Sequence, residues 1–139
     1  MKTKEDILKF IKQQRVCVLS TMAPDGKPEA AAIEFAETDN FELIFDTFYT
    51  YRKYPNLKAN PHVAVVIGWD DATVQYEGIA TEAEGEEMER LKAIFAKKTP
   101  GAAKFFDIPQ TRYFKVTPKW LRLRDYSTTP ETVIELTDF

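Results

Sequence analysis

Short β-prone runs separated by turn signals recur along this 139-residue chain, and they constrain its fold more than any other feature. Turn residues at 24–27 and 38–40 join the first three runs as hairpins. Such short connections leave no room for the crossover helices of a parallel sheet. A closed antiparallel barrel with peripheral helices buries many strands without open edges. We therefore predict a mainly β (α+β) fold, a six- to seven-stranded antiparallel barrel, with strands at 16–21, 28–36, 41–47, 63–67, 73–84, 111–117 and 119–126 and an edge strand at 133–136.

Helical periodicity is found in three segments. The first covers residues 3–14, where Thr3 is the expected N-cap and Asp6 completes a capping-box pattern. A short helix is expected at 51–59. A third covers residues 86–98, with acidic residues at its start and lysines at its end, as the helix dipole favours.

Two of the expected strands carry a further signal. Residues 63–67 are apolar without interruption, which predicts a strand buried on both faces. Gly78 lies inside the long strand at 73–84, where glycine is typical of a bulge or a tight bend.

Composition excludes several classes of protein. No repeat or linker interrupts the chain, so we expect one domain over residues 1–139. A net charge of −3 argues against nucleic acid as the main partner. No apolar run approaches the roughly 20 residues that span a bilayer, so no membrane partner is expected. The N-terminus lacks the apolar core of a signal peptide, and one cysteine allows no intrachain disulfide, so a cytoplasmic location is expected.

Catalysis by a metal or a side-chain triad finds little support. His62 is the only histidine and Cys17 the only cysteine, and they lie far apart in the sequence. A zinc site of the usual kind needs more such ligands, so no metal is expected. We interpret His62 as a structural or surface residue and Cys17 as an inert buried thiol. Redox chemistry would therefore need a borrowed cofactor.

The segment 43–61 holds the main candidate site. Arg52 and Lys53 stand side by side near the expected start of a helix, where the dipole already disfavours cations. Pro55 is tolerated only near a first turn, which places the helix start there and makes Thr50 a candidate N-cap. A bound phosphate would supply the missing anion. The alternative is a pair of solvated surface cations, and the residues alone leave both open.

Other candidates each have a structural alternative. Thr47 and Asp46 end the strand before these cations. Thr47 either contacts a ligand or is a strand-end hydroxyl bonded to the backbone, and Asp46 either accepts a hydrogen bond from the polar edge of a ligand ring or marks the rim of the barrel. The small residues around Ala31 and Ala32 would let a flat ring lie against the backbone, or serve close packing. Trp120 is a weak ligand candidate, because the arginines that alternate with it indicate an outer barrel face.

Three groups of residues stand out by their order and spacing over roughly residues 3–126. They are the opening hairpin with Val18-Leu19-Ser20-Thr21 and Asp25-Gly26-Lys27-Pro28; Phe45-Asp46-Thr47 with Tyr51-Arg52-Lys53, Leu57 and Asn60-Pro61; and Glu77-Gly78-Ile79-Ala80. Together these groups resemble the pyridoxamine 5′-phosphate oxidase-like, FMN-binding split β-barrel proteins. The smaller general stress protein-like branch is the better comparison.

The resemblance implies a split barrel that binds FMN between two subunits of a homodimer. It assigns the FMN phosphate to Arg52 and Lys53 and a flavin contact to Thr47. The second strand, at Ala31, Ala32 and Ile33, would line the isoalloxazine ring. The strand that leads to Gly78 would contribute contacts near Thr73 or Gln75, often across the dimer interface. Asp46, Tyr51 and Trp120 complete the expected cofactor-binding set.

The chain also departs from the family's pattern. Tyr51 stands where Ser or Thr often precedes the cation pair, and Ala31 stands where an Arg often supplies a further phosphate contact. Nothing after Trp120 matches the substrate segment of true pyridoxamine-phosphate oxidases. Oxidation of vitamin B6 is therefore not expected.

The expected function is that of an FMN-dependent oxidoreductase that passes electrons from a reduced nicotinamide to a small acceptor. No catalytic acid or base is assigned. One alternative is a non-catalytic flavin- or haem-binding module for storage or sensing. Another is a deazaflavin-binding relative, although the longer acidic tail of deazaflavin would call for more cations than the segment offers.

Overall fold

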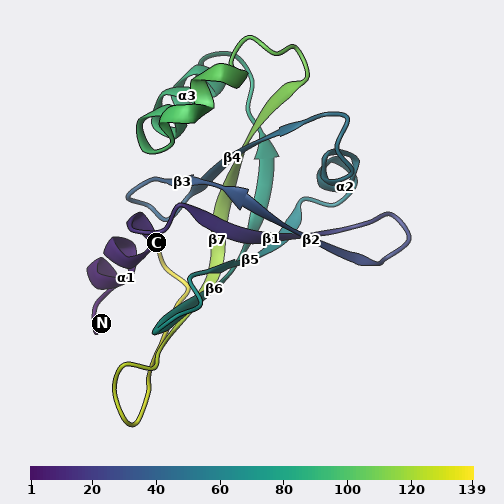
Figure 1. Ribbon diagram of the computed structural model, residues 1–139. Helices are drawn as coiled ribbons and strands as arrows, with labels where there is room; N and C mark the ends of the chain where they lie inside the picture. Colours follow the sequence, from purple (N-terminus) through teal and green to yellow (C-terminus); the bar gives the residue numbers. More distant parts are fainter.

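The computed structural model describes all of residues 1–139, with eight strands in one sheet and helices around it (Figure 1). In chain order the elements are α1 (Lys4–Lys12), β1 (Val16–Met22), β2 (Pro28–Glu34), β3 (Ala36–Glu37), β4 (Leu43–Phe48), α2 (Lys53–Ala59), β5 (His62–Ile67), β6 (Ala72–Glu82), α3 (Gly85–Lys98), the 3-10 helix η1 (Pro100–Phe105), β7 (Thr111–Asp125) and β8 (Thr132–Leu136).

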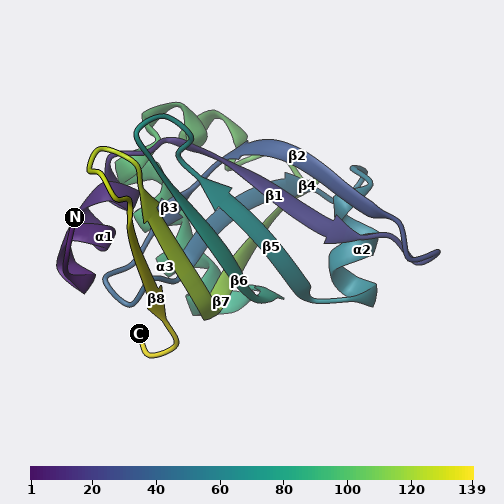
Figure 2. The ribbon, with the colours of Figure 1, turned by 90° about the horizontal axis from the view of Figure 1, so that it is seen from below.

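The sheet curls because its two ends are tied together by the chain. Its strands follow the order β2-β1-β5-β6-β7-β4-β3, and β8 is added beside β7. All the pairs are antiparallel. Strands β2 and β3 lie at opposite ends of this order, yet only the buried Phe35 separates them in the sequence. Two Cα–Cα steps span at most about 7 Å, so the sheet rolls into the expected split barrel (Figure 2).

The strand predicted at 28–36 is thus divided at Phe35, and the strands predicted at 111–117 and 119–126 are one strand, β7. The β6–β7 register shifts between Glu77 and Gly78, and Gly78 faces Pro118. This shift confirms the predicted bulge. The same shift explains how β7 continues past Pro118, because a proline at a bulge need not donate a hydrogen bond to the neighbouring strand. A Cβ on Gly78 would lie 2.5 Å from the carbonyl oxygen of Thr117, so glycine is required there.

The barrel interior is filled by alternate side chains of the strands. In β5, Val63, Val65 and Ile67 are buried, whereas Ala64 and Val66 are exposed on the outer face. The prediction that this strand is buried on both faces is therefore wrong for the chain by itself. The apolar pattern leaves an exposed apolar face instead.

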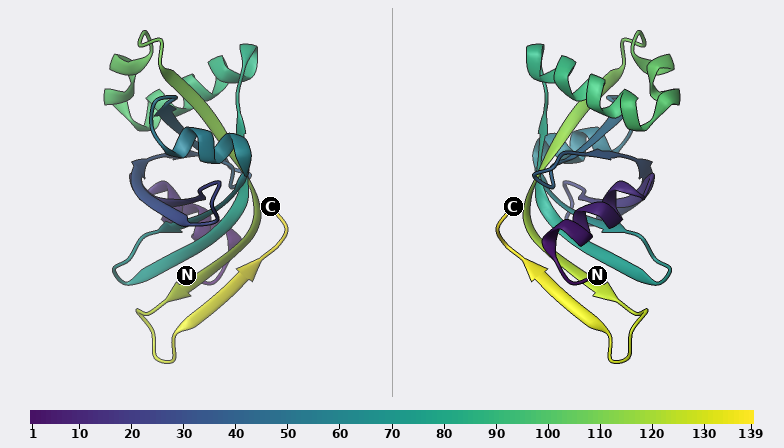
Figure 3. Two further views of the ribbon diagram at one scale, coloured as in Figure 1. Left: turned by 90° about the vertical axis from the view of Figure 1, so that its right-hand side faces the viewer. Right: turned by 90° about the vertical axis from the view of Figure 1, so that its left-hand side faces the viewer.

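Helices close the barrel and cover its flanks. The capping box of Thr3 and Asp6 on α1 is confirmed, and Ile7 and Ile11 of this helix enter the core. Helices α1 and α2 lie at opposite ends of the sheet (Figure 2), and α3 and β8 lie far apart in the side views (Figure 3). No helix has both the length and the hydropathy that crossing a membrane requires.

Candidate functional site

The turn between β4 and α2 places the two cations at one end of the barrel. Helix α2 begins at Lys53, and Arg52 occupies the N-cap position in αR conformation without a side-chain cap. The prediction of Thr50 as N-cap is wrong, because the chain first turns, with the Tyr51 N–H donating to the carbonyl of Phe48 at 3.0 Å. Helix α2 has only seven residues and few aligned peptide dipoles. The side chains, rather than the helix dipole, therefore carry the charge of this region.

Two adjoining cavities open beside these cations, and they share Tyr51 and Lys53. Cavity A, of 360 Å³, lies between the start of β2 and residues 50–53. Cavity B, of 240 Å³, lies between the end of β2 and the end of β4. Cavity A is also lined by Leu19, Thr21, Glu29, Ala30, Ala31 and Arg52, and cavity B by Ala32, Ile33, Glu34, Asp46, Thr47 and Phe48.

Cavity B lies where the barrel is split. Strand β2 is hydrogen-bonded on one side only, to β1. Strand β4 pairs with the short β3 only at Leu43 and Ile44, so residues 45–48 have no strand partner on that side. Residues of both incomplete edges line the cavity. Backbone donors and acceptors at such edges are free to bind a polar ring.

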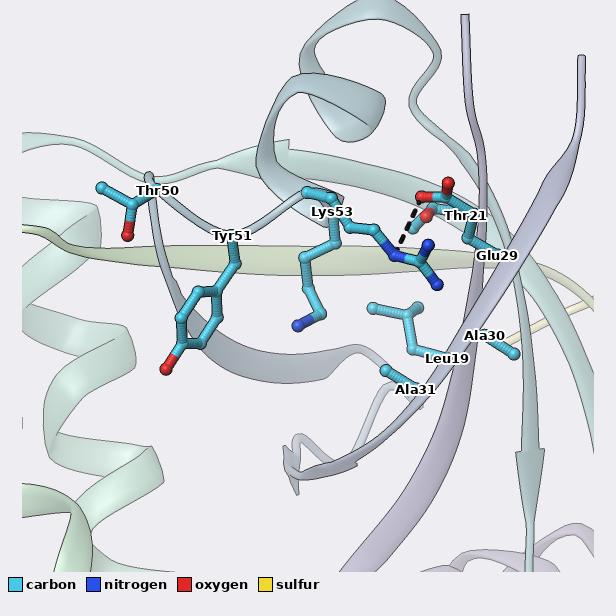
Figure 4. Close-up of a pocket in the computed structure, with 9 residues that line it drawn as sticks. Leu19, Thr21, Glu29, Ala30, Ala31, Thr50, Tyr51 and Lys53 are labelled. Atoms are coloured by element: carbon cyan, nitrogen blue, oxygen red, sulfur yellow. Dashed lines mark ion pairs between the residues drawn. The ribbon is translucent and has the colours of Figure 1, made fainter. Parts of the chain in front are cut away.

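The two cations differ in their surroundings. The Arg52 side chain is 74% exposed, and its Nε lies 3.4 Å from Oε1 of Glu29. Lys53 is half-buried and takes part in none of the ion pairs of the chain; its Nζ lies 5.3 Å from the ring centroid of Tyr51. Partial burial lowers the pKa of Lys53. In Figure 4 its side chain extends between Tyr51 on one side and Leu19 and Ala31 on the other. Lys53 is thus a cation without an ion-pair partner at the junction of the cavities, and the Asp46 carboxylate acts on it only from a longer distance.

The end of β4 brings two of the other predicted residues into cavity B. Burial, and then the charge of Glu34, raise the pKa of the Asp46 carboxyl. Thr47 is buried, and its hydroxyl donates to the carbonyl of Phe48 at 3.3 Å. The structural alternative considered for Thr47, a strand-end hydroxyl bonded to backbone, is therefore present, and its side chain still lines the cavity.

A polar network behind cavity A was not anticipated from the sequence. Asn56 of α2 is 3% exposed, and its Nδ2 donates to Oε1 of Glu29 at 2.7 Å and to Oγ1 of Thr21 at 3.1 Å. Glu29 therefore accepts from Asn56 and pairs with Arg52 through the same oxygen. The one signal of this network in the sequence was Asn56 itself, a polar residue next to the buried Leu57, because a buried amide needs a hydrogen-bond partner.

Three of the eleven predicted residues lie away from both cavities. Thr73 and Gln75 of β6 and Trp120 of β7 are on the outer face of the sheet, where the Arg122 guanidinium lies 5.3 Å from the Trp120 ring centroid. Ala32 and Gln75 belong to one row across β2, β1, β5 and β6. Three strand spacings separate them, about 14 Å. Contacts from these residues to a ligand in cavity B would have to come from a second subunit.

His62 is exposed at the start of β5, and Cys17 is buried with its thiol pKa raised to about 12 by burial. Neither lines cavity A or B. No group of three or more His, Cys, Asp and Glu side chains is placed to hold a metal ion.

Comparisons with known proteins agree with this architecture. The family model described as pyridoxamine 5′-phosphate oxidase matches residues 3–125. The pyridoxine/pyridoxamine 5′-phosphate oxidase of Rubrobacter xylanophilus is 34% identical over 87 residues, which are 61% of this chain and 39% of that protein. This chain thus matches about two fifths of the curated relative's length.

Two solved structures extend the likeness to most of the chain. General stress protein 26 from Bacillus anthracis is 27% identical and superposes with a TM-score of 0.76 over 98% of this chain and all of its own. A haem-binding protein from Mycobacterium smegmatis has a TM-score of 0.78 over 89% of this chain and 53% of its own, at 17% identity, and shows the fold alone. The family match, the split barrel and the stress-protein likeness lead to one conclusion: the chain belongs to the pyridoxamine 5′-phosphate oxidase-like family.

Proposed function

We propose that residues 1–139 form one FMN-binding domain, with the FMN phosphate held by Arg52 and Lys53 in cavity A and the ring in cavity B. The observation that carries this proposal is Lys53, a half-buried cation with no ion-pair partner where the two cavities meet. An ammonium group that is partly desolvated and unpaired favours an anionic ligand.

The residues around the cavities fit this cofactor. Ala31, Ala32 and Ile33 offer small or flat apolar surface along β2. The incomplete edges of β2 and β4 offer backbone groups to the polar edge of the ring, beside Thr47 and Asp46. Cavity volumes of 360 and 240 Å³ together match the range of small-molecule sites. Tyr51 borders both cavities, which places it beside the cofactor in this proposal.

Bound FMN would supply hydride or electron transfer, and the protein would position its ring and exclude water. We propose a reductase that oxidises a reduced nicotinamide and reduces a small acceptor, rather than an oxidase of vitamin B6. The contrast in coverage supports this preference, because the likeness to the stress protein spans all of that protein, whereas the match to the curated oxidase spans 39% of its length. Asp46 and Tyr51 are among the polar side chains of cavity B, with Glu34, Thr47 and Lys53, and neither is assigned a catalytic role.

A homodimer is part of the proposal. The outer face of β1 and β5 exposes Val16, Met22 and Val66, next to the exposed Ala64. A second subunit on this face would bury apolar surface that the chain itself leaves in water. It would also explain why residues 63–67 are apolar throughout, and it could bring Gln75 or Trp120 of the partner toward cavity B.

The decisive experiment measures FMN and riboflavin binding to wild type and to the Arg52→Ala/Lys53→Ala variant. Each lost charge-assisted contact is expected to weaken FMN binding about ten- to hundredfold, whereas riboflavin, which has no phosphate, should bind equally to both. Lys97→Ala/Lys119→Ala is the control, because both lysines are exposed and line neither cavity. Unchanged FMN affinity in the Arg52/Lys53 variant would show that the phosphate assignment is wrong.

Haem is the alternative ligand, because a similar structure is that of a haem-binding protein. Neither cavity is lined by histidine, cysteine or methionine, the commonest axial ligands of haem iron. Addition of haemin and FMN in separate titrations distinguishes the two: a Soret band that shifts on binding, without flavin uptake, would favour haem. Oxidation of a reduced nicotinamide by the FMN-loaded protein would then separate an enzyme from a storage or sensor module.

A further inference from the structure

The strongest unexplained feature is a carboxylate inside the candidate anion site. Glu29 lines cavity A together with both cations. Its Oε1 lies 3.4 Å from Nε of Arg52, the ion pair drawn dashed in Figure 4. A site built only to bind phosphate would gain nothing from an acidic side chain at this position, because like charges repel.

Glu29 and Arg52 are held very differently. The Glu29 side chain is 22% exposed and accepts from the buried Asn56 at 2.7 Å. The Arg52 side chain is 74% exposed and has no other hydrogen-bond or ion-pair partner. An exposed ion pair of this kind is weak and exchanges readily. The anion is therefore fixed, whereas the cation is free to change partners.

The balance of charge in cavity A follows from these three residues. Arg52 and Lys53 contribute two positive charges, and Glu29 removes one of them. A ligand phosphate that enters the cavity gains Arg52 only by taking it from Glu29, and then lies close to an anion that Asn56 keeps in place.

We propose that Glu29 is a specificity-determining residue, an internal counterion that competes with the ligand's phosphate for Arg52. It lowers affinity for phosphate-bearing ligands and leaves ligands with a neutral tail unaffected. This inference rests on the proposed FMN site, since it concerns the same cavity. The alternative is a structural role, in which Glu29 only holds α2 in place through Asn56; its loss would then change the affinity for all ligands.

Glu29→Gln separates the two roles, because a Gln amide oxygen still accepts from Asn56 while its charge is absent. Glu82→Gln is the matched control. Glu82 also joins a strand to α2: its Oε1 accepts from the Tyr54 hydroxyl at 2.6 Å and lies 3.4 Å from Nζ of Lys58, and it lines neither cavity. Both variants change the net charge equally, so any difference between them is local to cavity A.

The experiment measures the dissociation constants of FMN, riboflavin and inorganic phosphate for wild type, E29Q and E82Q by calorimetry. In E29Q we expect FMN and phosphate to bind about two- to fivefold more tightly, with riboflavin unchanged. In E82Q all three should match wild type. Adding Arg52→Gln to E29Q should abolish the gain, because the competition acts through Arg52.

Other outcomes overturn the inference. Equal FMN affinities of wild type and E29Q refute competition while leaving the FMN site intact, and an equal gain in E82Q would assign the effect to net charge. If none of the three proteins binds FMN, the proposed function fails, and the affinity for inorganic phosphate then tests the competition: an affinity that is not higher in E29Q than in wild type refutes it.

If E29Q does not fold, the NMR resonance of the Arg52 Nε–H group in wild type tests the exchange of partners instead. It should shift as phosphate is added, and a resonance that stays in place refutes the exchange of partners.

Discussion

Replacement of Asn56 by Ala tests the polar network that supports the proposed site. The change removes the bond to the Glu29 carboxylate at 2.7 Å and the bond to the Thr21 hydroxyl at 3.1 Å. A hydrogen bond to a charged group contributes about 1.5–3 kcal/mol and a neutral one about 0.5–1.5 kcal/mol. Their sum is about 2–4.5 kcal/mol. Because the Glu29 side chain is 22% exposed, water replaces part of the loss, and we expect the lower half, about 2–3 kcal/mol.

Urea unfolding measures this loss as a lower midpoint with an unchanged m-value. Thr21→Val removes only the neutral bond, so it should destabilise the protein by about 0.5–1.5 kcal/mol. A double-mutant cycle of Asn56→Ala with Glu29→Ala isolates the charged contact, and a coupling free energy of about 0.5–3 kcal/mol is expected. A loss below about 0.5 kcal/mol for Asn56→Ala, or a coupling near zero, would contradict the argument that Asn56 fixes Glu29.

Two further predictions concern pH and assembly. Hydrogen bonds from Ser127, together with the amino group of Met1, lower the pKa of Asp125 from 3.8 to about 2. A carboxyl group whose pKa is lower in the folded state stabilises the fold at pH values above its unfolded pKa, and this stabilisation is lost as pH falls through the folded pKa. Asp125→Asn should therefore lower the melting temperature near neutral pH, and the difference from wild type should vanish toward pH 2. A difference in melting temperature that does not change with pH would contradict this. Val66 is 38% exposed on the apolar outer face, so light scattering should give twice the chain mass of 16.0 kDa for wild type and a single chain for Val66→Arg, whereas an unchanged mass would place the subunit interface elsewhere.

Local signals in the sequence predicted local structure well. The Thr3 capping box and the Gly78 bulge were confirmed because each depends on residues close in the chain or on one backbone requirement. The antiparallel barrel could be predicted because short turns connect many of its strands as hairpins. The division at Phe35 and the continuity of β7 were missed, because both depend on how distant strands meet.

The candidate site could be predicted only in part for the same reason. Eight of the eleven predicted residues line the two cavities, since they lie on β2, on β4 and in the turn that follows. Glu29 and Asn56 are 27 positions apart, and no spacing rule joins a strand residue to a helix residue at that separation. The pairing of Arg52 with Glu29 also supplies a partner for one of the two cations, which leaves Lys53 as the stronger sign of a bound anion.

The single residue between β2 and β3 has a consequence for which molecules the split can admit. At Phe35 the two edges are joined covalently, and from there β2 runs toward Pro28 while β4 runs from Ile44, opposite Ala36, toward Phe48. The opening is therefore a wedge with a closed apex. A flat ring in the proposed site would meet this closed apex at Phe35, so the width of the ring would limit how far it reaches toward that residue. Insertions at Phe35 would widen the apex and admit bulkier rings, whereas insertions in the hairpin at 24–27 would leave the wedge unchanged.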